Sequence, residues 1–106
     1  MSDAIVVFMT VASADEARRI AKELVDQHLA ACVQILPAIE SVYRWKDEVQ
    51  RETEILILAK TTAARFDDLE KAVRAMHSYD TPEIVAVPVS KISEPYREWL
   101  IENVRS

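Results

Sequence analysis

The 106-residue chain contains no glycine. Glycine supplies backbone with positive φ and lets a ligand approach the main chain closely. Its absence therefore excludes a phosphate-binding P-loop, a dinucleotide-binding turn, a glycine-centred nucleophile elbow and an ordinary EF-hand loop. No Ser/His/Asp set is visible, and residues 10–13 lack the Arg-bearing, Gly-rich loop of an acylphosphatase. We therefore expect that the protein is not an enzyme.

Cysteine and positive charge are also scarce. Cys32 is the single cysteine, so no intrachain disulfide can form. Because the N-terminus does not read as a signal peptide either, we expect a cytoplasmic protein. The first apolar run, residues 4–9, is too short to cross a bilayer. A net charge of −5 and a pI near 5.0 disfavour nucleic acid and anionic membranes as partners.

The apolar periodicity predicts one α+β domain over residues 1–106, since no linker or repeat interrupts it. The predicted order is β-α-β-β-α-β with a further helix at the C-terminus, which is the ferredoxin-like arrangement. The predicted strands are residues 4–10, 32–36 resuming after Pro37 as 39–46, then 49–60 and 83–89. Ser13 followed by Glu16 predicts a capping box at the first helix. Thr62 and Ser93 read as caps of the other two helices, and residues 47–48 as a hairpin turn.

The predicted strands are apolar on both faces of the sheet. Ile5 and Val7 alternate with Val6 and Phe8 in the first strand, for example. A sheet with helices on one face should alternate apolar and polar residues, and two principal helices cover only one face. We therefore expect a second copy of the chain to cover the other face. The alternative is a monomer capped by its C-terminal helix, which is too short to cover four strands.

The predicted hairpin is longer than a small domain needs. At about 3.3 Å per residue, its arm over residues 49–60 reaches roughly 40 Å. A domain of this length has a radius of gyration of only about 13 Å. The tip, which carries Tyr43 and Trp45, should therefore project past the body and pack on a neighbour. Trp45 and Trp99 are the expected interface anchors.

Four segments, in this order, strongly resemble the CutA divalent-cation tolerance family: LAACVQILP, SVYRWKDEV, EILILAKTT and HSYDTPEIVAVPV. The likeness covers nearly the whole chain and implies a ferredoxin-like homotrimer associated with copper and other divalent-cation tolerance. That family's trimer is similar to the PII signalling proteins. The resemblance therefore also implies an alternative, a signalling or ligand-binding trimer that uses clefts between subunits.

The chain departs from the family pattern at three positions. Asp47 stands at the hairpin turn and Ala38 follows Pro37, where the family usually has glycine. Ser78 follows the histidine where the family usually has proline. These differences concern the geometry of turns and leave the predicted fold unchanged.

A weak copper site is the first candidate site. The resemblance implies Cys and His ligands at positions that here include Met9 and Met76, with His77 as the remaining strong ligand; such a set favours Cu(I). In this fold the first strand and second helix run in the same direction, so Met9, Met76 and His77 should share one edge. Cys32 should lie near the opposite edge and reach His77 only across a subunit boundary. The alternatives are buried hydrophobes for the sulfur residues and a helix-terminal cation for His77.

A cleft between subunits is the second candidate site. Lys60 ends the third predicted strand, Tyr79 and Glu83 flank the start of the fourth, and Trp45 lies at the hairpin tip. Lys60 would hold an anionic group and Glu83 a cationic group of a small ligand. The alternative is a structural salt bridge with a packed aromatic rim. Apart from copper, we expect no cofactor.

Overall fold

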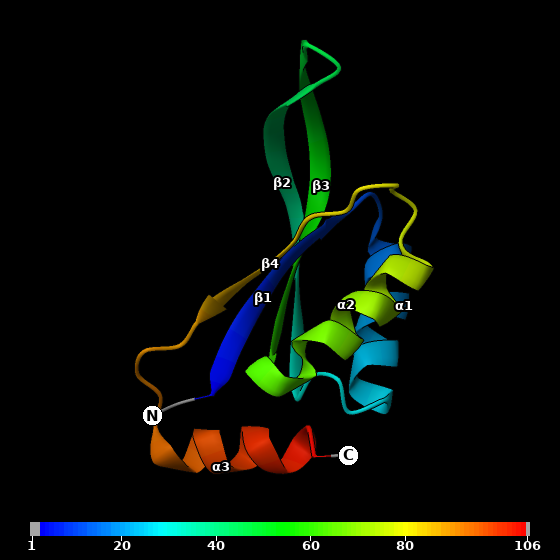
Figure 1. The fold of residues 1–106 in the computed structure, drawn as a ribbon. Coiled ribbons are helices and arrows are strands. Elements are labelled where there is room, and N and C mark those ends of the chain that lie inside the picture. Colours follow the sequence, from blue (N-terminus) through cyan, green and yellow to red (C-terminus); the bar gives the residue numbers. More distant parts are fainter. Residues whose placement is uncertain (1–2, 106) are drawn as a thin grey trace.

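The computed structural model describes residues 3–105, which form a four-stranded antiparallel sheet and three α-helices (Figure 1). The strand order is β2-β3-β1-β4, so the predicted arrangement of elements is confirmed. No helix within the described range is long and apolar enough to cross a membrane. In chain order the elements are β1 (Ala4–Val11), α1 (Ala14–Asp26), β2 (Cys32–Trp45), β3 (Glu48–Thr62), a 3₁₀ turn (Ala63–Arg65), α2 (Phe66–Met76), β4 (Ile84–Pro88) and α3 (Glu94–Asn103).

Helices α1 and α2 lie on the same face of the sheet, and the main core lies between them and the strands (Figure 1). Val7 and Met9 of β1 are fully buried there, against Ile20 of α1 and Leu69 of α2. The apolar residues of each helix recur every three or four positions, which places them on one stripe facing the sheet. Full burial of each such side chain contributes roughly 1.5–3 kcal/mol.

The helix ends match the predictions only in part. Ser13 Oγ accepts a hydrogen bond from the Glu16 N–H at 3.2 Å, as predicted for the cap of α1. The Glu16 carboxylate does not complete the capping box, because it accepts hydrogen bonds from Ser78 instead. Ser93 is the N-cap residue of α3, as predicted, whereas Thr62 precedes the 3₁₀ turn instead of α2; neither side chain makes a cap hydrogen bond. A 3₁₀ turn follows Thr62 and separates it from α2.

Strands β2 and β3 form a hairpin that projects beyond the other elements (Figure 1). β2 continues past Pro37, because a β-bulge between Leu36 and Ile39 absorbs the residue that cannot donate to the ladder. The turn consists of Lys46 and Asp47, both with positive φ, as in a type I′ turn. It therefore lies one residue before the predicted position. The hairpin stretches the chain to 44 Å, against 26 and 23 Å in the other directions.

The sheet face opposite α1 and α2 is open and apolar, as predicted. Val6 and Phe8 of β1 pair with Val87 and Val85 of β4, so these side chains share that face. Val85 and Val87 keep 53% and 44% of their surface exposed. α3 lies across the end of the sheet and does not cover this face (Figure 1).

Four residues of the described chain adopt left-handed backbone without being glycine. They are His28 (φ 58°), Ala38 (52°), Lys46 (51°) and Asp47 (66°). This conformation costs a residue with a Cβ roughly 1–2 kcal/mol. Ala38 and Asp47 are two of the positions where the family resemblance leads one to expect glycine. The chain keeps the left-handed backbone there, and both residues therefore carry this conformational strain.

Candidate functional site

His77 lies at the C-terminal end of α2, with its side chain fully buried. Nε2 is 2.8 Å from the backbone carbonyl of Thr10, at the end of β1. Nδ1 accepts a hydrogen bond from the Tyr79 N–H at 3.0 Å. The proton therefore sits on Nε2, which donates to Thr10, and both ring nitrogens are in use.

The contact between His77 and Thr10 confirms that the ends of β1 and α2 share one edge of the sheet. Met9 is fully buried in the core, and Met76 packs against the same core. Both thioethers thus have the packing role that methionine commonly fills. Within residues 3–105, no three His, Cys, Asp or Glu side chains come together in a way that could hold a metal ion.

Cys32 lies at the other end of the sheet, as predicted. It pairs across the strands with Lys60 and contacts Tyr96 of α3. Burial, and then the neighbouring Cys32, raises the pKa of the Tyr96 hydroxyl above its ordinary value of 10.0. The Lys60 ammonium lies 5.7 Å from the centre of the Tyr96 ring, within cation–π range. Lys60 therefore belongs to this cluster beside α3, and its predicted place in a cleft with Tyr79 and Glu83 is not found within one chain.

Ser78 and Glu16 form a contact that the sequence analysis missed. The buried Glu16 carboxylate accepts hydrogen bonds from the Ser78 N–H at 2.8 Å and from its hydroxyl at 3.1 Å. A proline at position 78 would supply neither donor. The departure from the family pattern at Ser78 and the acid at Glu16 are thus physically linked, and only a structure brings residues 62 positions apart together.

A cavity of about 540 Å³ lies where the hairpin leaves the body of the molecule. We call it the acidic cleft. Of the four residues predicted for a ligand cleft, Trp45, Tyr79 and Glu83 line it, whereas Lys60 does not. The lining residues are Thr10, Ser41, Val42, Tyr43, Trp45, Glu52, Glu54, Tyr79, Asp80, Thr81 and Glu83.

Two tyrosine–carboxylate pairs flank the acidic cleft. Tyr79 donates its hydroxyl to Glu54 at 2.8 Å, and Tyr43 donates to Glu52. Burial, followed by the bond to Glu54, raises the pKa of Tyr79 well above its ordinary value of 10.0. The bond to Glu52 likewise raises the pKa of Tyr43. Both phenols therefore stay protonated and act as donors to the carboxylates.

The two glutamates were also missed from the sequence, although a signal was present. Glu52 and Glu54 are two residues apart on β3, as Tyr43 and Trp45 are on β2. Residues at this spacing share a face of a strand. The β2–β3 register pairs Ser41 with Glu52, which puts both sets on the same face of the hairpin. Given the hairpin, period-two spacing could have predicted this group.

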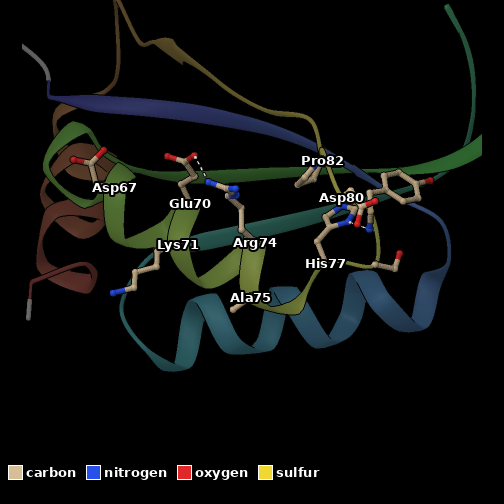
Figure 2. Close-up of a pocket in the computed structure, with 10 residues that line it drawn as sticks. Asp67, Glu70, Lys71, Arg74, Ala75, His77, Asp80 and Pro82 are labelled. Atoms are coloured by element: carbon tan, nitrogen blue, oxygen red, sulfur yellow. Dashed lines mark hydrogen bonds and ion pairs between the residues drawn. The ribbon is translucent and has the colours of Figure 1, made fainter. Parts of the chain in front are cut away.

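A second cavity, of about 580 Å³, lies beside α2 and the segment that follows it (Figure 2). Its lining is of mixed charge. Arg74 and Glu70 form an ion pair at 3.8 Å, and Lys71 and Asp67 extend the exposed side of α2. The α2 side of this cavity has the character of a solvated helix face, and His77, Ser78, Tyr79 and Asp80 line its other side.

The model of the CutA1 divalent ion tolerance protein family matches residues 5–103. The chain belongs to this family. The resemblance drawn from four segments is therefore confirmed. Among relatives in the CutA family, the divalent-cation tolerance protein CutA of Thermus thermophilus is 49% identical over 98 residues, covering 92% of this chain and 95% of that protein. The chloroplastic CutA of Arabidopsis thaliana is 41% identical, and the match covers 96% of this chain and 56% of that protein.

Solved CutA structures share the fold over nearly the whole chain. The Thermus thermophilus protein superposes with a TM-score of 0.93 at 48% identity, covering 94% of this chain and 97% of that one. The Archaeoglobus fulgidus protein, described as periplasmic, gives 0.93 at 36% identity, with 96% and 99% covered. CutA1 from Oryza sativa gives 0.94 at 40% identity, with 98% and 95% covered. The long hairpin and three helices are thus the fold of the CutA family.

Proposed function

We propose that this CutA-family chain acts as a homotrimer that binds copper weakly and contributes to the response to metal ions. The observation that carries self-association is the open apolar face of the sheet. Family membership supports the divalent-cation role, and the family resemblance supports the number three. We propose further that the protein is cytoplasmic and acts by binding, without catalysing a reaction.

The exposed apolar surface supports assembly at two places. Val85 and Val87 lie on the open sheet face, and Leu36 on the edge strand β2 is 39% exposed. At the hairpin tip, Trp45 and Val49 are 51% and 62% exposed. A monomer rarely leaves so much contiguous apolar surface in water. Burial of both regions in one assembly would remove this surface from solvent.

Light scattering coupled to size-exclusion chromatography tests the assembly. We expect a particle three times the mass of the 12.1 kDa chain. Val85→Glu should shift the particle towards the monomer, because it places a charge in the buried interface. Val25→Glu, at an exposed apolar position of α1, is the matched control and should leave the mass unchanged. A wild-type particle of 12.1 kDa would contradict the proposal.

Weak copper binding follows from the state of His77. A metal ion at either ring nitrogen must displace a hydrogen bond, to Thr10 or from Tyr79. Each such bond contributes about 1 kcal/mol. The sulfur atoms of Met9 and Met76 would complete a soft site suited to Cu(I). Affinity is therefore reduced by the bonds that the free protein already makes.

Calorimetry with Cu(I) and Cu(II) tests this site. His77→Ala should abolish the heat of binding, and Met76→Leu should weaken Cu(I) more than Cu(II). The leucine conserves most of the side-chain volume, so the variant keeps its core. Equal binding by wild type and Met76→Leu would remove the sulfur from the site. Equal binding by wild type and His77→Ala would remove the imidazole.

The acidic cleft supports a second candidate function, a PII-like trimer that binds a small ligand. The volume of about 540 Å³ lies within the usual range of small-molecule sites, about 300–1,000 Å³. Three aromatic residues and several polar groups line it, which is the usual composition of such sites. Binding of a small molecule there, without any metal ion, would favour this function over the copper site.

A further inference from the structure

The outer half of the hairpin has little support from the rest of the chain. β1 pairs with β3 only as far as Val11 and Ile55, so residues 39–54 form a two-stranded ribbon beyond the sheet. Within residues 39–54, all of which the structure describes, Glu54 is the single buried residue. A two-stranded hairpin is marginally stable by itself and twists more strongly than a wider sheet. Its direction therefore depends on the contacts at its base.

One side-chain hydrogen bond connects this outer half to the body. The Tyr79 hydroxyl donates to Glu54 at 2.8 Å, from the segment between α2 and β4 that passes beside the base of the hairpin (Figure 1). No other side-chain hydrogen bond or ion pair among residues 3–105 joins residues 39–54 to residues outside the hairpin. Glu54 is only 6% exposed, and a buried carboxylate is costly without a hydrogen-bond donor. This bond therefore resists opening.

Tyr79 is itself held in place by the end of β1. Its N–H donates to Nδ1 of His77 at 3.0 Å, and the centres of the two rings lie 4.8 Å apart. Nε2 of His77 donates to the Thr10 carbonyl at 2.8 Å. The side chains of His77 and Glu54 are both buried, so water competes weakly for these bonds. We call the chain of contacts Thr10–His77–Tyr79–Glu54 the brace, and it ties the end of β1 to the first residue of β3 beyond their pairing.

The position of the brace makes its effect large at the hairpin tip. At about 3.3 Å per residue, residues 48–54 span roughly 20 Å, so a rotation of about 10° at Glu54 moves the tip by about 3.5 Å. Dispersion contacts lose a quarter to a half of their energy over a gap of only about 0.5–1 Å. A small change in the hairpin angle would therefore remove the exposed tip residues Trp45 and Val49 from contact with another copy.

We propose that the brace fixes the angle of the hairpin in the orientation that assembly needs, with Tyr79 as the positioning residue. This inference rests on the proposed self-association and adds the device that orients one of its two contact regions. It assigns no ligand to the acidic cleft and does not depend on copper. Without the Tyr79 hydroxyl the hairpin samples many angles. Association then weakens in proportion to the fraction of chains in the competent orientation.

Tyr79→Phe and Tyr43→Phe form a matched pair of variants for the effect on assembly. Each removes one phenol hydroxyl from a glutamate of β3, but the bond from Tyr43 to Glu52 lies wholly within the hairpin. We expect Tyr79→Phe to dissociate at a protein concentration at least tenfold higher than wild type, and Tyr43→Phe to stay within about threefold. Sedimentation velocity at several concentrations measures this. Glu54→Gln, whose amide oxygen still accepts the hydroxyl, should associate like wild type, and Glu54→Ala like Tyr79→Phe.

Pulsed electron spin resonance measures the hairpin angle itself, whether or not the chain assembles. Nitroxides at Arg19→Cys on α1 and Arg51→Cys on β3, both exposed positions, report the distance from the body to the hairpin in a Cys32→Ala background. Labelled chains are diluted with unlabelled ones, so that an assembled particle carries one labelled chain. We expect a narrow distance distribution in the otherwise unchanged protein and with Tyr43→Phe, and a broader one with Tyr79→Phe.

Two results would overturn the inference. Equal dissociation of Tyr79→Phe and Tyr43→Phe would show that the brace has no special role in assembly. A lower melting temperature in Tyr79→Phe with an unchanged distance distribution would reduce the bond to a contribution to stability. If Tyr79→Phe does not fold, Glu54→Gln and Glu54→Ala give the same comparison. A monomeric wild type would instead refute the proposed self-association, and the distance distributions would still decide whether the brace orients the hairpin.

Discussion

Ala38 follows Pro37 in the bulge of β2, with a φ of 52°. An alanine in this conformation carries roughly 1–2 kcal/mol of strain that glycine avoids, although glycine loses more entropy on folding. We expect Ala38→Gly to raise the free energy of unfolding by about 0.5–1 kcal/mol. Urea denaturation measures it as a higher midpoint with an unchanged slope. Ala86→Gly, within β4, is the control and should lower stability by roughly 0.5–1 kcal/mol.

Ser78 satisfies the buried Glu16 carboxylate through its backbone N–H and its hydroxyl. Ser78→Ala removes one donor and should cost about 1 kcal/mol. Ser78→Pro removes both and leaves a buried carboxylate without these donors, so we expect a loss of at least 2 kcal/mol, in the range for bonds to charged groups. Thermal and urea unfolding of the two variants measure the difference. Equal stability of the two would show that the N–H bond contributes nothing.

Tyr79 links alkaline pH to stability. Its pKa is raised in the folded protein, so the unfolded chain ionises first as the pH rises. The stabilisation is therefore complete below about pH 10 and is lost progressively above it. We expect Tyr79→Phe to be less stable than wild type at neutral pH, because Glu54 loses its donor, and to lose less stability between about pH 8 and 11. Urea midpoints at both pH values test this, and parallel losses would contradict it.

The hairpin is the element whose length was predictable and whose details were not. Its apolar density predicted two long strands, but the proline at position 37 suggested a break. In the structure, a bulge at residues 36–39 shifts the pairing register between β2 and β3, so β2 continues past the proline. The turn position shifted by one residue because Lys46 and Asp47 both accept positive φ. Because neither residue is glycine, the local sequence does not predict positive φ at these two positions.

The hairpin tip should contribute to assembly and not to the fold of the single chain. Val42 and Val49 are 56% and 62% exposed, and both lie in the half of the hairpin that β1 does not reach. We expect the double variant Val42→Ser, Val49→Ser to keep its far-ultraviolet circular dichroism and to dissociate at a protein concentration at least tenfold higher than wild type. Sedimentation at several concentrations measures this. Val25→Ser on α1 is the matched control.

At the scale of the whole molecule, the stability of the folded chain should depend on its assembly with other copies. Val85 and Val87 gain a partner only from another copy if the open face is an interface, so folding and association are linked. We expect the melting temperature of wild type to rise with protein concentration and that of Val85→Glu to be independent of it. Scanning calorimetry over a hundredfold range of concentration tests this. A wild-type melting temperature that ignores concentration would count against the interface.

The topology also decides how far the candidate sites were predictable. The prediction that β1 and α2 run in the same direction correctly placed His77 near the end of β1. This was possible because the directions of strands and helices follow from the order of the elements. The burial of His77, with both ring nitrogens bonded, depends on the path of residues 78–83 and was not predictable. Lys60 lies near the end of β3, as predicted, but within one chain the entry to β4 lies at the other end of the sheet, so the place of Lys60 in a cleft between subunits stays a prediction.

The left-handed backbone at Ala38 and Asp47 has a consequence for how this gene can change. Alanine and aspartate codons both become glycine codons when only the second base is replaced. Histidine and lysine codons need two replacements, so a single-base mutation cannot remove the backbone strain at His28 or Lys46 by introducing glycine. Selection of random single-base mutants for survival of heating should therefore return glycine at positions 38 and 47 before 28 and 46. In this chain without glycine, one base change at either of positions 38 and 47 should therefore increase heat resistance.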